Sequence, residues 1–199
     1  MKRGIVLFVG LIALLDSNRA LARKRAGPSQ PRSQPPANVE QWLGRETWAT
    51  LKGARRVQVL LVGSKPMSAE VRRRDGKETV GGFPIQGTGP VSGLSLAQRI
   101  SSILLDEASY SKDVIPFGRL IKSCAFSPNA VFRIWDLDDD HHIDVWFSAY
   151  CNQVQYSTTD GEKRPAGEGD VTPSRKLLVR FLKDSFPDVV AIQSLEEVR

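Results

Sequence analysis

The sequence predicts a small α+β domain in which an antiparallel sheet contains a disulfide-stapled hairpin and is covered on one face by two amphipathic helices. Segments 130–136 and 143–150 alternate apolar and polar residues, as half-buried strands do. The two cysteines of the chain, Cys124 and Cys151, bracket these segments. Two further stretches carry apolar residues at helical spacing. Sheet and helix signals in one short chain indicate a mixed fold.

The N-terminus has the composition of a secretory signal peptide. Lys2 and Arg3 precede an apolar run over residues 5–15, and a small-x-small site ends at Ala22. An uncleaved membrane anchor is the alternative, although a spanning helix needs roughly 20 apolar residues, about twice the length of this run. We expect residues 1–22 to be removed, which leaves a secreted or periplasmic chain without a transmembrane helix.

The rest of the chain divides into a linker and one domain. Residues 23–38 are rich in proline and basic side chains, and alanine is their only apolar type. Such a segment cannot bury enough apolar surface to offset its ordering entropy, so we expect a disordered linker. Residues 39–199 have globular composition and are numerous enough to form a single core.

The charge distribution limits the choice of partners. The formal net charge of +6 does not by itself imply nucleic acid, and no aromatic-interleaved RNA-binding strand is present. Basic residues concentrate between Lys52 and Lys77, and acidic residues between Asp136 and Asp144. Solvated loops are the simpler interpretation. A basic surface for an anionic envelope polymer or lipid head group is the alternative.

The first half of the domain predicts one strand and one hairpin. Residues 56–63 are β-branched and apolar with little alternation, which indicates a strand covered on both faces. Asp75-Gly76 favours a tight turn between the polar arms 70–74 and 77–80. Residues 81–93 are rich in glycine and proline and predict a loop.

Two helices are expected. Ser95 and Gln98 have the spacing of a capping box, and apolar residues follow at helical intervals to Leu104. The second helix is predicted to start at Thr172-Pro173 and to end at Phe186-Pro187. Its expected buried stripe is Leu177, Leu178, Phe181 and Leu182, and its expected water-facing residues are Arg175, Lys176, Arg180 and Lys183.

The two alternating strands form a hairpin in which we expect Asp136 to pair with Ile143. This register places Arg133 opposite Trp146, within reach of a cation–π contact, and diagonal to Asp144. The predicted core face is Ala130, Phe132, Ile134, Val145, Phe147 and Ala149. The predicted opposite face is Val131, Arg133, Trp135, Asp144, Trp146 and Ser148.

The two cysteines are expected to form one disulfide. In an exported protein a single cysteine pair most simply means a bridge, and Pro128 lets the chain double back towards the second strand. A metal pair or a reactive thiol are the alternatives, but two thiols supply only half of a zinc site.

The stapled region resembles a pattern in uncharacterised exported bacterial proteins. In these, a Cys-x-x-x-Pro segment precedes a strand and a second cysteine closes the next one, as Cys124–Pro128 and Cys151 do here. A helix ending in Phe-Pro, like Phe186-Pro187, is also similar. The resemblance supports the disulfide and carries over no catalytic residue.

The hairpin connection offers one candidate metal site. Asp136-x-Asp138-x-Asp140 alternates carboxylates, but an EF-hand needs glycine and a carboxylate where His141 and Phe147 stand. A looser calcium or zinc site formed by Asp138, Asp140, His141 and His142 remains an alternative. So does a metal-dependent hydrolase that uses these residues.

The sequence therefore predicts an exported, non-enzymatic binding or accessory domain with no cofactor. Its partner would be an unidentified protein or envelope component. The candidate contact surface is Arg133, Trp135 and Trp146, because aromatic and arginine side chains dominate binding energy.

Overall fold

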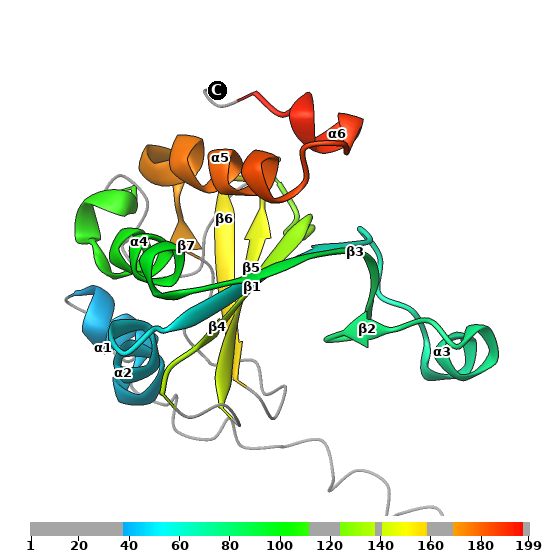
Figure 1. Ribbon diagram of the computed structural model, residues 1–199, viewed down its shortest axis with the longest axis horizontal. Helices are drawn as coiled ribbons and strands as arrows, with labels where there is room; N and C mark the ends of the chain where they lie inside the picture. The colour runs from blue at the N-terminus through cyan, green and yellow to red at the C-terminus, as the bar shows by residue number, and fades with distance from the viewer. Residues whose placement is uncertain (1–37, 112–123, 138–140, 159–168, 197–199) are drawn as a thin grey trace, which may run out of the picture. The chain divides into compact units, whose positions relative to one another are not determined.

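The computed structural model of the chain describes residues 38–111, 124–137, 141–158 and 169–196, all within the compact unit Pro35–Arg199 (Figure 1). The predicted signal peptide, residues 1–22, and all but the last residue of the predicted linker lie outside the described residues. Both assignments therefore stay predictions.

The described residues form helices and strands with the following bounds. The helices are α1 Val39–Leu43, α2 Arg45–Lys52, α3 Ala69–Asp75, α4 Leu94–Leu105, α5 Arg175–Ser185 and α6 Val190–Gln193, with 3-10 turns at Glu107–Ser109 and Thr172–Ser174. The strands are β1 Arg56–Val62, β2 Thr79–Val80, β3 Phe83–Ser92, β4 Ala130–Trp135, β5 His142–Ser148, β6 Gln153–Thr158 and β7 Gly169–Asp170.

The strands form one antiparallel seven-stranded sheet in the order β2-β3-β1-β4-β5-β6-β7. A disulfide joins Cys124 to Cys151, with the two Cα atoms 5.7 Å apart. The predicted class is confirmed: a mixed α+β fold on an antiparallel sheet with a stapled hairpin.

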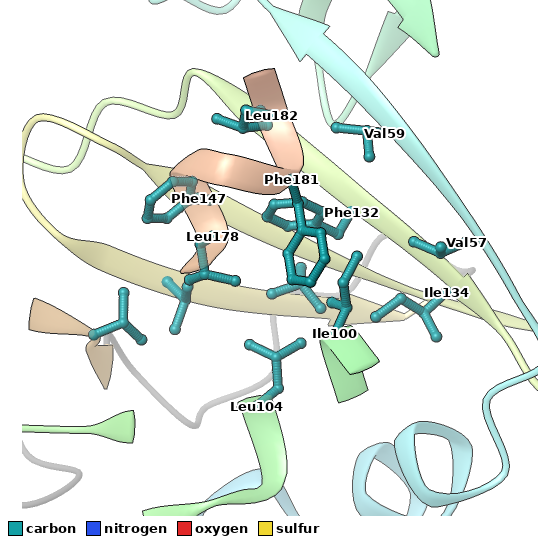
Figure 2. Close-up of a cluster of buried hydrophobic side chains, with 14 of the residues drawn as sticks. Val57, Val59, Ile100, Leu104, Phe132, Ile134, Phe147, Leu178, Phe181 and Leu182 are labelled. Atoms are coloured by element: carbon teal, nitrogen blue, oxygen red, sulfur yellow. The ribbon is translucent and has the colours of Figure 1, made fainter. Parts of the chain in front are cut away.

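One face of this sheet carries the main core. Side chains of β1, β4 and β5 meet those of α4 and α5, and α1 and α2 contribute to the same cluster (Figure 2). We call the sheet face that carries this cluster the core face. The labelled members are Val57, Val59, Ile100, Leu104, Phe132, Ile134, Phe147, Leu178, Phe181 and Leu182.

The opposite face, which we call the outer face, carries a second, smaller apolar cluster. It contains Leu60, Val62, Val80, Val131 and Trp146, with Phe83, Ile85 and Phe126 packed against it. Because β1 contributes to both clusters, the prediction that this strand is covered on both faces is confirmed.

The hairpin pairs in a register two residues away from the predicted one. Ile134 pairs with Ile143, and Arg133 with Asp144, whereas we predicted Asp136 opposite Ile143. Side chains alternate with a period of two, so a two-residue shift leaves every residue on its predicted face. The division of residues between the faces is therefore right and the partners are wrong.

The predicted hairpin at Asp75-Gly76 is a helix terminus. Residues Ala69–Asp75 form α3, and Gly76 adopts φ 60° while its N–H donates to the carbonyl of Arg72. Asp-Gly suits a turn because glycine accepts positive φ, and the same property suits a helix end. The two polar arms of the predicted hairpin have no apolar face, so pairing them as strands would bury little apolar surface.

Residues predicted as a loop form the ten-residue strand β3. A Cβ atom at Gly89 would lie 3.1 Å from the carbonyl oxygen of Val59, and one at Gly87 would lie 3.4 Å from Cε1 of Phe186. These glycines allow close approach inside a strand. The same composition had indicated a loop.

Both predicted helices exist with altered ends. Helix α4 starts at Leu94 after the N-cap Gly93, without a side-chain cap, so the Ser95 capping box is not formed. In α5, Arg175 is buried and Leu177 is exposed, opposite to the prediction. The helix begins after a 3-10 turn, and the Arg175 Nε donates to the Ala149 carbonyl at 3.3 Å.

Candidate functional site

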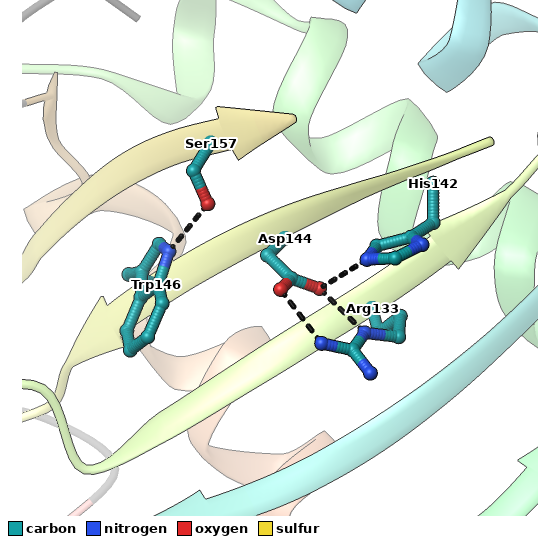
Figure 3. Close-up of polar contacts among 5 residues, drawn as sticks. All are labelled: Arg133, His142, Asp144, Trp146 and Ser157. Carbon is teal, nitrogen blue, oxygen red and sulfur yellow. Dashed lines mark hydrogen bonds and ion pairs between the residues drawn. The ribbon is translucent and has the colours of Figure 1, made fainter. Parts of the chain in front are cut away.

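An ion pair lies at the centre of the outer face. Arg133 on β4 is directly opposite Asp144 on β5. Its Nε donates to Oδ1 at 2.8 Å and its Nη2 to Oδ2 at 2.9 Å (Figure 3). The Asp144 side chain is 6% exposed and the Arg133 side chain 25%. Two parallel charge-assisted hydrogen bonds fix both side chains in one geometry.

Trp146 lies beside this pair and not opposite Arg133, so the predicted register for a cation–π contact is wrong. Its cross-strand partner is Val131, and its Nε1 donates to the Ser157 Oγ at 2.9 Å. Phe83 packs against the indole with ring centroids 5.5 Å apart. Trp146 is 8% exposed.

The turn between β2 and β3 approaches Trp146 closely. Gly81 has φ +51°, and a Cβ atom there would lie 2.6 Å from the indole Cη2. Only glycine satisfies both the backbone conformation and this approach. The turn therefore covers part of Trp146 and holds Phe83 beside it.

Trp135 occupies the other end of the same face and is half-buried. The Arg56 guanidinium carbon lies 5.4 Å from its ring centroid, and the His142 ring lies 5.8 Å from it. Arg133, Trp135 and Trp146, the predicted contact residues, thus share the outer face. The cation–π contact seen there joins Arg56 to Trp135 and is not the predicted one between Arg133 and Trp146.

Arg133 and Trp146 line a groove of about 570 Å³ on the outer face, and Trp135 lies outside its lining. Phe83 and Phe126 supply aromatic walls, Arg133 and Asp144 supply a charged floor, and His142 adds a polar side chain. The remaining lining residues are Thr79, Val80, Gly81, Trp146, Gln155, Tyr156, Ser157 and Thr158. Apolar walls with a few convergent polar groups are typical of ligand sites.

The disulfide sits next to one wall of the groove. Cys124 is two residues before Phe126, and Cys151 follows β5. The Asn129 side chain also accepts a hydrogen bond from the Ala149 N–H at 2.9 Å, at the other end of the same segment. The segment that carries Phe126 is therefore attached to the end of β5 on both sides.

The groove lowers the pKa of His142. Partial burial disfavours the charged imidazolium and outweighs the attraction of Asp144, whose Oδ1 is 3.7 Å from Nε2. The same carboxylate raises the pKa of Arg133, chiefly through their hydrogen bonds. The guanidinium thus stays charged and the imidazole is mainly neutral near neutral pH.

We expect an NMR titration to give His142 a pKa below its ordinary value of 6.5. Asp144→Asn should lower it further, because the variant removes the charge that favours the imidazolium. In the unfolded chain His142 has the higher pKa, so it binds a proton at a higher pH than in the folded chain. The free energy of unfolding should therefore fall as pH drops through 6.5 towards the folded pKa. His142→Gln should reduce that slope, and an unchanged slope would contradict this assignment.

The candidate metal ligands are only partly placed. Asp138 and Asp140 lie outside the described residues. His141 is exposed, and His142 is half-buried and lines the groove. Within the described part of the chain, no three histidine, cysteine or acidic side chains are grouped as a metal site requires. The metal hypothesis stays a prediction.

Sequence reasoning missed the residues that border the groove from outside the hairpin. Phe83 and Gly81 belong to a segment interpreted as loop, and Phe126 was considered only as part of the Cys-x-x-x-Pro stretch. The one available signal was Gly81-Gly82 followed by an aromatic residue, which suits a tight turn between strands.

Comparisons with protein families, curated proteins and solved structures found no match. Among the described residues, no helix is long and apolar enough to cross a membrane.

Proposed function

We propose that this chain is an exported, non-enzymatic binding domain whose outer-face groove receives a protein or another envelope component. One observation carries the proposal: aromatic walls converge on a fixed, charged floor. Aromatic and arginine side chains in partly desolvated positions supply most of the energy in protein interfaces. Arg133 and Trp135 are the candidate contacts that keep partial exposure.

The polar groups of the groove favour binding over catalysis. Both oxygens of Asp144 accept hydrogen bonds from Arg133, which holds this carboxylate in the floor of the groove. The Ser157 hydroxyl accepts a hydrogen bond from Trp146 and is 5% exposed. Groups held in this way orient a ligand, whereas a catalytic base or nucleophile needs a lone pair directed at the substrate.

Export is part of the proposal and rests on three features. The first 22 residues have the order of segments of a signal peptide, with cleavage expected near Ala22. The disulfide suits an oxidising, extracytoplasmic compartment. The stapled region resembles uncharacterised exported bacterial proteins, which makes a bacterial source part of the same proposal.

Site-specific photo-cross-linking in the producing cells tests the groove. A photoreactive phenylalanine analogue at Phe83 or Gln155 would report contacts there, and one at Val190, which is 81% exposed on α6, is the matched control. We expect a discrete cross-linked product from the groove positions and not from α6. Phe126→Ala, which removes one aromatic wall of the groove, should reduce its yield. Equal products from all three positions would overturn the proposal.

Thermal melting of the purified protein distinguishes the proposed binding domain from the alternative of a metal-binding module. A melting temperature that rises with calcium or zinc, and no longer does so in Asp138→Asn/Asp140→Asn, would favour a metal-binding module at the hairpin tip. A binding domain of the proposed kind should respond to neither change.

A further inference from the structure

Helix α3 folds without contributing to either core. None of its residues is buried. The Ser68 Oγ accepts a hydrogen bond from the Val71 N–H at 3.3 Å, and Gly76 ends the helix in a left-handed conformation. A seven-residue helix is marginal by propensity alone. Local caps therefore define it, and burial in this domain does not explain why it is there.

The attachments on both sides of α3 hold it at one end of the sheet. The Met67 N–H donates to the Gly82 carbonyl at 2.8 Å, and the Ile85 N–H donates to the Glu78 carbonyl at 3.0 Å. The strand that follows, β2, pairs with the start of β3. Figure 1 shows α3 beyond β2, at the end of β3 opposite to α4. We call residues 64–78 the α3 arm.

The α3 arm carries five basic side chains against three acidic ones, Glu70, Asp75 and Glu78, which gives it a net charge of +2. It also contains apolar side chains. Arg72, Arg73 and Arg74 are consecutive, and the exposed Lys65 and Lys77 flank them. Arg74 pairs with Asp75 at 2.9 Å but its side chain stays 75% exposed. The neighbouring apolar residues Met67 and Val71 are not fully buried.

The sequence cluster of basic residues is divided in the structure. Lys52 ends α2, Arg55 and Arg56 lie at the start of β1, and the α3 arm follows the end of β1. The arm's cations are therefore a separate patch. Basic residues next to accessible apolar ones are typical of segments that lie on anionic bilayers.

We propose that the α3 arm docks on a bilayer surface rich in anionic phospholipids. The arginine guanidinium groups match phosphate geometry with paired hydrogen bonds. Met67 and Val71 favour a bilayer over a soluble polyanion, because only the bilayer also accepts apolar side chains. This docking is independent of the groove and of its partner, so either proposal can fail without the other.

Hydrogen exchange of the full chain tests the proposal. Exchange is read only at the peptide that covers the α3 arm, so that binding of the apolar N-terminus to the vesicles is not counted. We expect phosphatidylglycerol vesicles to slow exchange across the arm, and phosphatidylcholine vesicles not to. Arg72→Gln/Arg73→Gln/Arg74→Gln should abolish the protection and lower the arm's apparent affinity roughly 10- to 100-fold. Arg73→Gln/Arg74→Gln, which keeps the half-buried Arg72, should weaken the protection in the same direction and keep the wild-type melting temperature, because both replaced residues are exposed.

A matched variant removes the same charge from α5. Lys176→Gln/Arg180→Gln/Lys183→Gln should retain protection of the arm. If both variants lost protection of the arm equally, the net charge of the domain would explain the binding, and the proposal would be overturned. The proposal would also be overturned if phosphatidylcholine vesicles protected the arm or if neither kind of vesicle did. Stronger protection by soluble polyphosphate than by phosphatidylglycerol vesicles would overturn it as well.

Discussion

Cys124→Ala/Cys151→Ala is expected to lower the free energy of unfolding by about 3–4 kcal/mol at 25 °C. The bridge spans 27 residues of sequence, and opening it returns the entropy of that loop to the unfolded chain. Alanine is the suitable replacement because Cys151 is 5% exposed and serine would bury a hydroxyl group. Urea denaturation monitored by circular dichroism measures the change.

Reduced wild-type protein is the control for this variant. It should lose a similar free energy, since reduction opens the same loop without altering the side chains beyond the sulfur atoms. Exchange of the Phe126 segment should rise in both samples, because Cys124 attaches it to the end of β5. Unchanged stability on reduction would mean that the bridge contributes nothing to the fold.

The faces of the hairpin could be predicted from the sequence, and its register could not. Alternation places Phe132 and Phe147 on the core face and Arg133 and Trp146 on the outer face in both registers. A shift by one residue would have exposed the phenylalanines, whereas a shift by two exposes nothing. The two registers differ in the residue opposite Arg133, which is Asp144 in the structure and Trp146 in the prediction. The apolar pattern gives no information on this contact.

The sequence predicted the floor of the groove but not its walls. Its floor belongs to the hairpin, where local alternation determines which side chains point together. One wall, Phe83, reaches the floor from a distant part of the sequence, and the other, Phe126, is near in sequence but is positioned by the disulfide and the Asn129 contact rather than by strand alternation. Glycines in β3 serve close packing against Phe186, and composition alone does not distinguish that role from a loop.

Asp144→Ala is expected to lower the free energy of unfolding by about 3 kcal/mol, the lower end of the range for breaking a buried pair. The variant leaves the Arg133 guanidinium, which is 25% exposed, without its carboxylate. The cost comes mainly from that uncompensated charge. Arg133→Met/Asp144→Leu should therefore regain most of the loss, because apolar residues of similar volume replace both partners.

Asp75→Ala is the matched control, since it also removes an aspartate that lies 2.9 Å from an arginine Nε. Arg74 is 75% exposed there, so breaking this pair should cost less than about 1 kcal/mol. Urea midpoints of the three variants measure the difference. Equal losses in Asp144→Ala and Asp75→Ala, or a double variant no more stable than Asp144→Ala, would contradict the assignment of Arg133 and Asp144 as a coupled pair on the groove floor.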